Sequence, residues 1–592
     1  MKNTIHHTAL AAAMFAAAFT VTNLLAEREK IWPEGKMPDA QPHQVAKMTN
    51  EAGDNRDPYI DWLPAPEKPN GCCMILISGG AYQNCCDVGL VQMWGRKFTA
   101  AGFQCVNFVY RTPRPKDLAI YQSAWEDGQR AVRLVRSQAV KRGFHAERVG
   151  TISMSAGSHL AALLATSALT PAYERIDELD DVPCHLNWAI TGAIAYAVDD
   201  GIGIANTRGG YDAKLDPVFK FDAKTAPMCM FHGSADPYSP MSSTMIYREL
   251  RKRHVPAELH LFADRRHGFW GADGRGDKAC AYDNWFDRAM EFLTQLGGFL
   301  GPLQPEVTLM SRFKEDFHDP AKYAKEELWP KGRMPDRQLK EDGADAQCVP
   351  YLEWYIPSNL TTKAVQIVYS GGAYQFNDVN GFEVAPARRF LNEKGMAVVT
   401  MKYRTPRPKG LAKHVTAWQD LQRCIRIVRS EAAEKGLDPD RIGIMGSSAG
   451  GHLTLMGVTS SQTPAYDAID DIDKLPCNVQ WGVGVYPAYS LTDGAEAENS
   501  TGGNDDSAQP VPEFAFDSGT CPMVFIHGDS DGWAAMNSVK AWERMRKMGV
   551  ACDLHTLCRR GHCFQAKASP GTGSYTWLGR IWEFMNHKGI NK

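Results

Sequence analysis

Two sets of serine, aspartate and histidine occur in the same order along this chain and with almost the same spacing. The sets are Ser155, Asp236 and His267 in the first half, and Ser448, Asp531 and His562 in the second. Aspartate and histidine are 31 residues apart in both sets, and serine and aspartate are 81 and 83 residues apart. A serine hydroxyl becomes a strong nucleophile when a histidine takes its proton and a carboxylate orients that histidine. The two sets therefore predict acyl transfer through a covalent intermediate on each serine.

The residues around each serine predict the sharp turn from a strand into a helix that exposes such a nucleophile. Residues 446–450 have the pattern Gly-x-Ser-x-Gly after a short apolar run, and a helical pattern follows them. In the first half, Ser153 replaces the leading glycine. Because serine is also small, we expect the turn to form in both halves.

Each of these residues, taken singly, also has a structural interpretation, as a turn serine or as a capped surface or core histidine. Agreement of order, spacing and context in both halves favours catalysis. Two further acids, Asp264 and Asp529, lie close to the predicted triads but are not shared between the halves, so we discount them. His232 and His527 are shared but stand at strand ends, where a structural role is the stronger expectation.

Backbone amides have to stabilise the oxyanion that forms during acyl transfer. One donor is expected from the residue after each nucleophile, Ala156 or Ala449. The others are expected from a glycine loop after the first core strand, at Gly80, Ala81, Gly372 and Ala373.

A tyrosine follows each of these glycine loops directly. Tyr82 and Tyr374 are equally consistent with lining a substrate pocket and with packing in the core. We therefore keep them as candidate substrate-binding residues, with packing as the alternative.

Longer identical segments in the sequence indicate a duplication. Residues 78–83 recur as residues 370–375, and residues 110–116 recur unchanged as residues 403–409. The offsets are 292 and 293 residues, whereas solenoid repeats have periods of roughly 20–50 residues. The repeated unit is therefore a whole domain.

A stretch rich in glycine and proline, residues 297–305, separates the two copies. Such a stretch is typical of a domain boundary. We expect one domain over residues 27–300 and a second over residues 301–592, each large enough for its own hydrophobic core.

In each copy, apolar runs alternate with amphipathic segments. Residues 74–77 and 365–369 have the pattern of buried strands, and residues 128–139 and 421–432 show the helical spacing of apolar residues. Strands that alternate with helices predict a mostly parallel sheet with helices on both faces. The expected fold class is α/β.

The N-terminal residues predict a secretory signal peptide. Lys2 is the only lysine, arginine, aspartate or glutamate before Glu27, and alanine dominates the stretch between them. A basic start, an apolar centre and a small residue before the cleavage point are typical of such a signal. The alternative is a membrane anchor, for which the stretch is short and interrupted by polar residues. We expect removal of residues 1–26, a product without a membrane attachment, and a secreted or periplasmic location.

Composition and charge argue against several other classes. The net charge of −3 leaves no basic stripe, so no nucleic-acid partner is expected. Of the 15 cysteines, only Cys184 and Cys477 clearly match between the copies. Bridges essential to the fold would have been kept in both copies, so we expect mostly buried thiols. The pairs Cys72-Cys73 and Cys85-Cys86 do not have the spacing of a zinc site, so we expect no metal, and no cofactor is implied.

A series of short motifs recurs in both copies in one order. In the second copy these motifs are residues 370–374, 403–404, 441–443, 448–453, 527–531 and 561–564. Their order resembles that of the secreted carbohydrate-esterase branch of the α/β-hydrolase fold, which includes acetylxylan and feruloyl esterases.

The resemblance implies two tandem α/β-hydrolase domains, each with a mostly parallel, doubly wound sheet. It implies a secreted serine esterase with two catalytic domains, which hydrolyses acetyl or feruloyl esters on plant cell-wall polysaccharide such as xylan. The partner would be an acylated carbohydrate or a small ester, with no cofactor, and no oligomeric state is indicated. The alternatives are a serine peptidase of the prolyl-oligopeptidase type, and one active esterase domain beside a non-catalytic binding domain.

Overall fold

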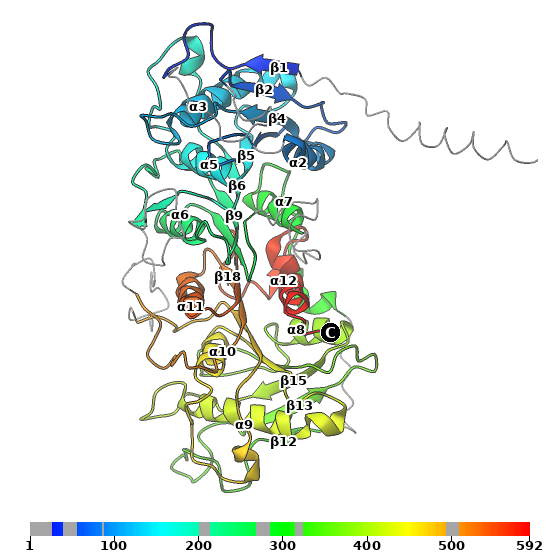
Figure 1. Cartoon of the computed structure of the whole chain (residues 1–592). Helices are drawn as coiled ribbons and strands as arrows, with labels where there is room; N and C mark the ends of the chain where they lie inside the picture. The colour runs from blue at the N-terminus through cyan, green and yellow to red at the C-terminus, as the bar shows by residue number, and fades with distance from the viewer. Residues whose placement is uncertain are drawn as a thin grey trace, which may run out of the picture.

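One large sheet runs the length of the molecule and carries helices on both faces (Figure 1). The computed structural model describes residues 27–39, 56–85, 88–199, 214–267, 284–313, 324–492 and 508–592. Over these residues the sheet has 16 strands. The predicted signal peptide, residues 1–26, lies outside the described residues.

The first half of the chain supplies eight strands of this sheet. They are β1 (Glu27–Lys30), β2 (Tyr59–Trp62), β3 (Cys73–Ile77), β4 (Gln104–Val109), β5 (Val149–Met154), β6 (Trp188–Gly192), β9 (Met228–Gly233) and β10 (Ala257–Phe262). They lie in the order β1-β2-β4-β3-β5-β6-β9-β10, and neighbours from β4 onward are parallel. Strands of such a sheet are covered on both sides, which is why β3 is a continuous apolar run.

The second half supplies the other eight strands. They are β12 (Glu326–Glu327), β13 (Tyr351–Tyr355), β14 (Val365–Tyr369), β15 (Ala397–Lys402), β16 (Ile442–Ser447), β17 (Trp481–Val485), β18 (Met523–Gly528) and β19 (Cys552–Leu557). Their order, β12-β13-β15-β14-β16-β17-β18-β19, is that of the first half. Two short pairs lie apart from the sheet, β7 (Val198–Asp199) with β8 (Lys214–Leu215) and β11 (Val307–Thr308) with β20 (Lys567–Ala568).

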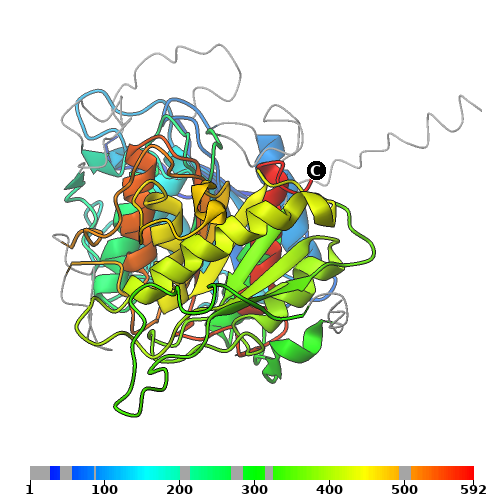
Figure 2. The same cartoon turned by 90° about the horizontal axis from the view of Figure 1, so that it is seen from below.

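Helices follow the strands and cover the two faces of the sheet (Figures 1 and 2). One face carries α3 (Gln122–Ser137), α5 (Ala156–Thr166), α6 (Met241–Lys252), α9 (Val415–Ala432), α10 (Ala449–Thr459) and α11 (Met536–Lys547). The other carries α2 (Val88–Ala100), α7 (Trp285–Leu296), α8 (Ala385–Glu393) and α12 (Gly573–His587). The shorter helices are α4 (Ala139–Arg142), η1 (Glu178–Asp181), η3 (Leu309–Arg312), η4 (Ala433–Lys435) and η5 (Asp471–Lys474).

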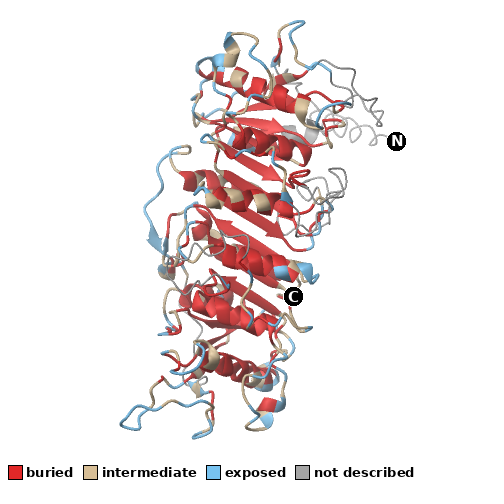
Figure 3. Cartoon of the chain, turned by 90° about the vertical axis from the view of Figure 1, so that its left-hand side faces the viewer, coloured by how far each residue is buried: buried red, intermediate tan, exposed pale blue. Residues whose placement is uncertain are grey.

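Burial follows the sheet from one end of the molecule to the other (Figure 3). The described cysteines are free thiols, and all except the half-buried Cys348 and Cys563 are buried. In the described part of the chain, no helix has both the length and the apolar character needed to cross a membrane.

Antiparallel pairing of β10 with β19 joins the two halves into one sheet. His260 faces His555 in this pair, and the amide of Leu259 donates a hydrogen bond to Oγ1 of Thr556 at 2.7 Å. An unpaired edge strand invites pairing with other chains. Each half therefore covers the last strand of the other.

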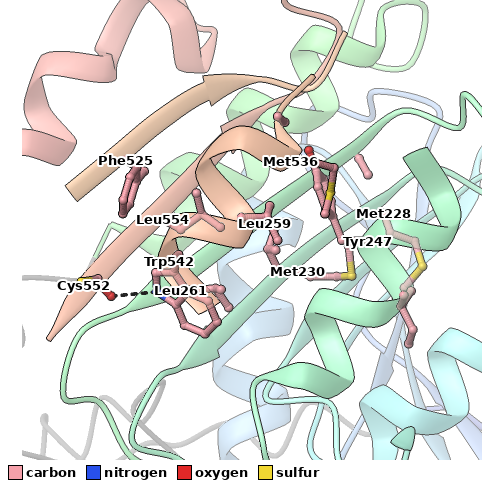
Figure 4. Packing of buried hydrophobic residues seen from close by; sticks show 14 of the residues in the cluster. Met228, Met230, Tyr247, Leu259, Leu261, Phe525, Met536, Trp542, Cys552 and Leu554 are labelled. Atoms are coloured by element: carbon pink, nitrogen blue, oxygen red, sulfur yellow. Dashed lines mark hydrogen bonds between the residues drawn. The ribbon is translucent and has the colours of Figure 1, made fainter. Parts of the chain in front are cut away.

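An apolar cluster crosses this seam (Figure 4). Leu259 and Leu261 of β10 belong to it together with Leu554 of β19. Trp542 of α11 is fully buried in the same cluster, and its indole N–H donates to the carbonyl oxygen of Cys552 at 3.1 Å. The halves thus share a core as well as a sheet.

Because of this shared core, we expect the full chain to unfold in one cooperative transition in urea. Leu261 is fully buried, so Leu261→Ala should lower the free energy of unfolding by about 2–5 kcal/mol. The control Leu169→Ala changes a side chain that is 59% exposed and should have little effect. Circular dichroism and tryptophan fluorescence measure both variants. Two separate transitions, of which Leu261→Ala shifts only one, would contradict the shared core.

Candidate active site

Each predicted nucleophile lies in a sharp turn between a strand and a helix. Ser155 connects β5 to α5 with φ 56° and ψ −124°, and Ser448 connects β16 to α10 with φ 55° and ψ −120°. A positive φ in a residue that carries a side chain costs of order 1–3 kcal/mol, and such strain is concentrated at functional sites. The turn expected from the sequence is therefore present in both halves.

Glycines beside the serines allow this turn to form. A Cβ added at Gly157 would lie 2.2 Å from the carbonyl oxygen of Ser78, and one added at Gly450 would lie 2.6 Å from that of Ser370. Both distances are too short for a real Cβ contact. The glycines thus let the start of each helix pack against the loop that follows the first core strand.

Ser153 stands where the second half has Gly446. A Cβ at Gly446 would meet the carbonyl oxygen of Gly450 at 2.3 Å. The first half accommodates the larger residue, and the hydroxyl of Ser153 lies 3.1 Å from that of Ser158. Since φ and ψ of the two nucleophiles agree to within 4°, Ser153 leaves the turn intact.

The structure brings the three predicted residues of the first half together. Nε2 of His267 lies 2.8 Å from Oγ of Ser155, and its Nδ1 lies 2.8 Å from Oδ2 of Asp236. The ring of Tyr238 packs against the His267 ring at 4.7 Å between centroids. Serine, histidine and aspartate form one continuous chain of hydrogen bonds.

The second half repeats this geometry. Nε2 of His562 lies 2.8 Å from Oγ of Ser448, and its Nδ1 lies 2.8 Å from Oδ2 of Asp531. The ring of Tyr486 lies 4.6 Å from that of His562. Each constellation takes all three residues from its own half, so neither depends on the other for a member.

Hydrogen bonds keep both aspartates ionised although they are buried. Burial raises the pKa of Asp236, but hydrogen bonds with His232 and His267 outweigh it and lower this pKa to about 2. The amide of Tyr238 also donates to Asp236 Oδ1 at 2.8 Å. The same balance holds the pKa of Asp531 well below its usual range. Each carboxylate is therefore negatively charged at neutral pH, where it can orient its histidine.

The residues that the sequence reasoning set aside make other contacts. Asp264 pairs with Lys588 at 2.9 Å, and Asp529 Oδ2 accepts from the amide of Ala257 across the seam at 3.1 Å. His232 lies behind Asp236, with its Nδ1 2.8 Å from the hydroxyl of Ser243. These contacts are structural.

The predicted oxyanion loops lie directly against the nucleophiles. A Cβ added at Gly371 would be 2.6 Å from Cβ of Ser448. Gly372 and Ala373 follow with φ of 91° and 54°. Among the described residues, none accepts a hydrogen bond from the amides of Gly372, Ala373 or Ala449. These amides are therefore available to a ligand, and Gly80 and Ala81 have the same left-handed conformation in the first half.

The prediction that Tyr82 and Tyr374 line the substrate pocket is wrong, and the packing alternative holds. Both side chains are fully buried. Their hydroxyls lie 2.8 Å from Nδ1 of His159 and of His452. A buried tyrosine needs a partner for its hydroxyl, and these histidines provide it, so the rings cannot reach a substrate.

In the second half, a pocket of about 510 Å³ opens beside the nucleophile. Its lining residues are Ser370, Gly372, Ala373, Phe376, Asp378, Gly381, Phe382, Glu383, Ser448, Tyr489, Trp533, His562 and Cys563. Sequence reasoning missed its aromatic residues. The only available signal was an aromatic residue two positions after each acid, Tyr238 and Trp533.

Glu383 is a buried carboxylate in this pocket and a further residue that the sequence did not indicate. Its Oε2 accepts a hydrogen bond from the amide of Gly371 at 2.7 Å, and its Oε1 accepts one from the hydroxyl of Tyr486 at 3.0 Å. Burial raises the pKa of Glu383. The two hydrogen bonds of Glu383 hold Gly371, at the start of the predicted oxyanion loop, and the ring of Tyr486, which packs against His562. In sequence register the first half has Val91 and Ala193 at the positions of Glu383 and Tyr486.

Comparison with protein families matches a segment in each half of the chain. The BD-FAE family pattern matches residues 61–182 and 352–542, together just over half of the chain. The pattern of the dienelactone hydrolase family matches residues 200–297.

Individual relatives match one part of the chain each. An acetylxylan esterase of Xylanibacter ruminicola is 34% identical over 126 residues, which are 21% of this chain and 24% of that protein. Esterase LipQ of Mycobacterium tuberculosis is 33% identical over 136 residues, which are 23% of this chain and 30% of that protein. The match thus spans less than a third of these relatives.

A solved structure of an acetyl ester-xyloside bifunctional hydrolase from Caldicellulosiruptor lactoaceticus is 24% identical to the chain. The match covers 45% of this chain and 97% of that one, with a TM-score of 0.36.

The low pKa of Asp236 makes stability depend on pH. Its carboxyl has a pKa of about 2 in the folded protein and about 3.9 in an unfolded chain. Stabilisation is therefore present above the unfolded pKa and is lost as the pH falls toward 2, by about 2–3 kcal/mol. Urea unfolding of wild type and Asp236→Asn between about pH 5 and pH 2.5 measures it. The wild type should lose more stability than the variant, and equal losses would contradict the assignment.

Proposed function

Because the chain belongs to the BD-FAE family, and because both of its copies hold a connected serine, histidine and aspartate, we propose that it is a serine esterase with two catalytic α/β-hydrolase domains. The match to the dienelactone hydrolase family and the names of the two relatives, both esterases, support this proposal. The observation that carries the proposal is the pair of 2.8 Å contacts that each histidine makes, with serine on one side and aspartate on the other.

In the proposed mechanism, aspartate accepts a hydrogen bond from the Nδ1–H group of histidine, which leaves the Nε2 lone pair facing the serine hydroxyl. Histidine takes the serine proton as Oγ attacks the ester carbonyl, and it returns this proton to the leaving alcohol. The amides of Ala449 and of the Gly372–Ala373 loop in the second half stabilise the oxyanion. Water then attacks the acyl-enzyme: histidine takes a proton from the water and returns it to the serine oxygen as the acid product leaves. Ala156, Gly80 and Ala81 act equivalently in the first half.

The proposed substrates are acetyl or feruloyl esters of plant cell-wall polysaccharide such as xylan. The name of the Xylanibacter relative, acetylxylan esterase, supports this substrate class. Phe376, Tyr489 and Trp533 give the second pocket an aromatic wall suited to a sugar ring or an aromatic acyl group. The N-terminal sequence supports export, which would bring the enzyme to such polymers outside the cytoplasm.

Differences around the two nucleophiles support two specificities rather than one. Glu383 and Tyr486 have no acidic or aromatic counterpart at Val91 and Ala193. A binding role for one half would not require all three triad residues in hydrogen-bonding contact. A peptidase of the prolyl-oligopeptidase type would need a gating domain, and the described elements belong to the shared sheet, its helices and two short pairs.

Serine variants test the proposal directly. Hydrolysis of 4-nitrophenyl acetate and of acetylated xylan is compared in Ser155→Ala, Ser448→Ala and the double variant. We expect each single variant to keep the activity of the other site and the double variant to lose more than about 10⁴-fold in kcat. A double variant with undiminished turnover would overturn the esterase assignment, and an unaltered single variant would overturn it for that half.

The role of the acid is tested in one site at a time. In a Ser155→Ala background, Asp531→Asn should lower kcat about 10⁴-fold because the amide favours the wrong histidine tautomer. Asp471→Asn is the matched control, since the Asp471 side chain is 93% exposed and pairs with Lys474 on the surface. Equal rates for the two variants would remove Asp531 from the mechanism.

A further inference from the structure

Behind the second pocket lies a cluster of ligating side chains that the esterase mechanism does not use. His414 immediately precedes α9, His452 lies in the first turn of α10, and Glu513 belongs to the segment between residue 508 and β18. One ligand atom from each lies within 4.8 Å of the others. We propose that these three residues form a divalent metal site of the Zn²⁺ type, with two imidazoles and one carboxylate.

The separations between ligand atoms fit such an ion. Nε2 of His452 lies 3.2 Å from Oε1 of Glu513, and Nδ1 of His414 lies 3.6 Å from the same oxygen. Zinc binds imidazole nitrogen and carboxylate oxygen at about 2.0–2.2 Å, which puts neighbouring tetrahedral ligands roughly 3.3–3.5 Å apart. The ligand atoms are thus already near the spacing that a tetrahedral ion requires.

The contacts around the imidazoles direct one nitrogen of each ring toward the Glu513 carboxylate. Nδ1 of His452 is engaged by the hydroxyl of Tyr374 at 2.8 Å, so its Nε2 is the atom that faces Glu513. A partner of this kind on the second ring nitrogen is typical of metal-binding histidines. Nδ1 of His414 is buried and makes no hydrogen bond to any described residue.

The cluster has access to solvent. The side chain of His452 is fully buried, whereas those of His414 and Glu513 are 14% and 22% exposed. An ion can therefore reach the site, and water can complete its coordination shell. The other cluster of this type among the described residues, Cys229 with Glu258 and His260, is buried throughout at the seam, so none of its ligand side chains is open to solvent.

The first half provides a natural control for this site. His159 occupies the position of His452, and Tyr121 and Val218 occupy those of His414 and Glu513. The register is anchored by equivalent hydrogen bonds, since Ser167 donates to the carbonyl oxygen of Val218 at 3.2 Å just as Ser460 donates to that of Glu513 at 2.9 Å. Of the three ligand positions, only His159 is a metal-binding residue in the first half, although the surrounding fold is the same.

The proposed ion would fix the wall of the second pocket. Lys413 lies over the ring of Tyr489, with Nζ 4.5 Å from its centroid. Tyr489 in turn packs on Trp533 at 4.7 Å between centroids, and both rings line the pocket. Coordination by His414 would hold this stack through the adjacent lysine, so the ion would position residues and take no part in the chemical step.

The test is metal binding by the full chain after removal of bound metals with a chelator. Isothermal titration with ZnCl₂ gives affinity and stoichiometry, and CoCl₂ gives the visible absorption of a four-coordinate nitrogen and oxygen site. We expect one equivalent per chain. The double variant His414→Tyr/Glu513→Val, which installs the residues of the first half, should bind at least about 100-fold more weakly. Glu513→Gln, which keeps the side-chain shape but removes the charge, should also weaken zinc binding.

His185→Asn is the matched control, because His185 pairs with Glu147 at 3.2 Å but belongs to no cluster of three metal-ligating side chains among the described residues. It should bind zinc like the wild type. Thermal melts establish that each variant is folded. Absence of stoichiometric binding by the wild type would overturn the proposal and leave an ion pair only. Binding that the two Glu513 variants do not weaken would overturn it as well, because the ion would then lie elsewhere.

Discussion

The left-handed backbone of Ser155 and Ser448 is the constraint on which both sites depend. A strand that turns into a helix within one residue holds each serine at φ near 55°, at a cost of order 1–3 kcal/mol. The surrounding ladder of parallel strands fixes the turn from one side. The close approach of Gly157 and Gly450 to the loops after β3 and β14 fixes it from the other. The same close approach brings the predicted oxyanion loop against the serine, so one local constraint sets two parts of each predicted site.

The parallel strands also bring the acid and the histidine of each set to its serine. Acid and histidine follow the carboxyl ends of β9 and β10 in the first half, and of β18 and β19 in the second, which brings them to the same edge of the sheet as the serine. The seam joins the copies through β10 and β19 without sharing any triad residue between them. Because each constellation is complete in its own half, the surroundings of the two serines can differ. Glu383, Tyr486 and the cluster around Glu513 occur only in the second half.

The sequence predicted the parts of the site that follow from short-range rules. The Gly-x-Ser-x-Gly turn and the order of serine, acid and histidine leave fixed spacings, and the contacts at His267 and His562 agree with them. The pairing of β10 with β19 has no such sequence signature, because it depends on which edge strand of each half remains unpaired. Tyr374 could not be assigned because its partner, His452, is 78 residues away. Glu383 and Glu513 likewise act through contacts between distant segments, for which a single sequence has no periodicity or motif.

The central claim, two working serine nucleophiles in one chain, is tested most directly by intact mass spectrometry after saturation with a fluorophosphonate. This reagent forms a stable adduct only with a serine that its histidine activates. The account predicts two adducts on the wild-type chain, one at Ser155 and one at Ser448. A single adduct would contradict the claim for the half that stays unlabelled, and a chain without any adduct would contradict the mechanism for both.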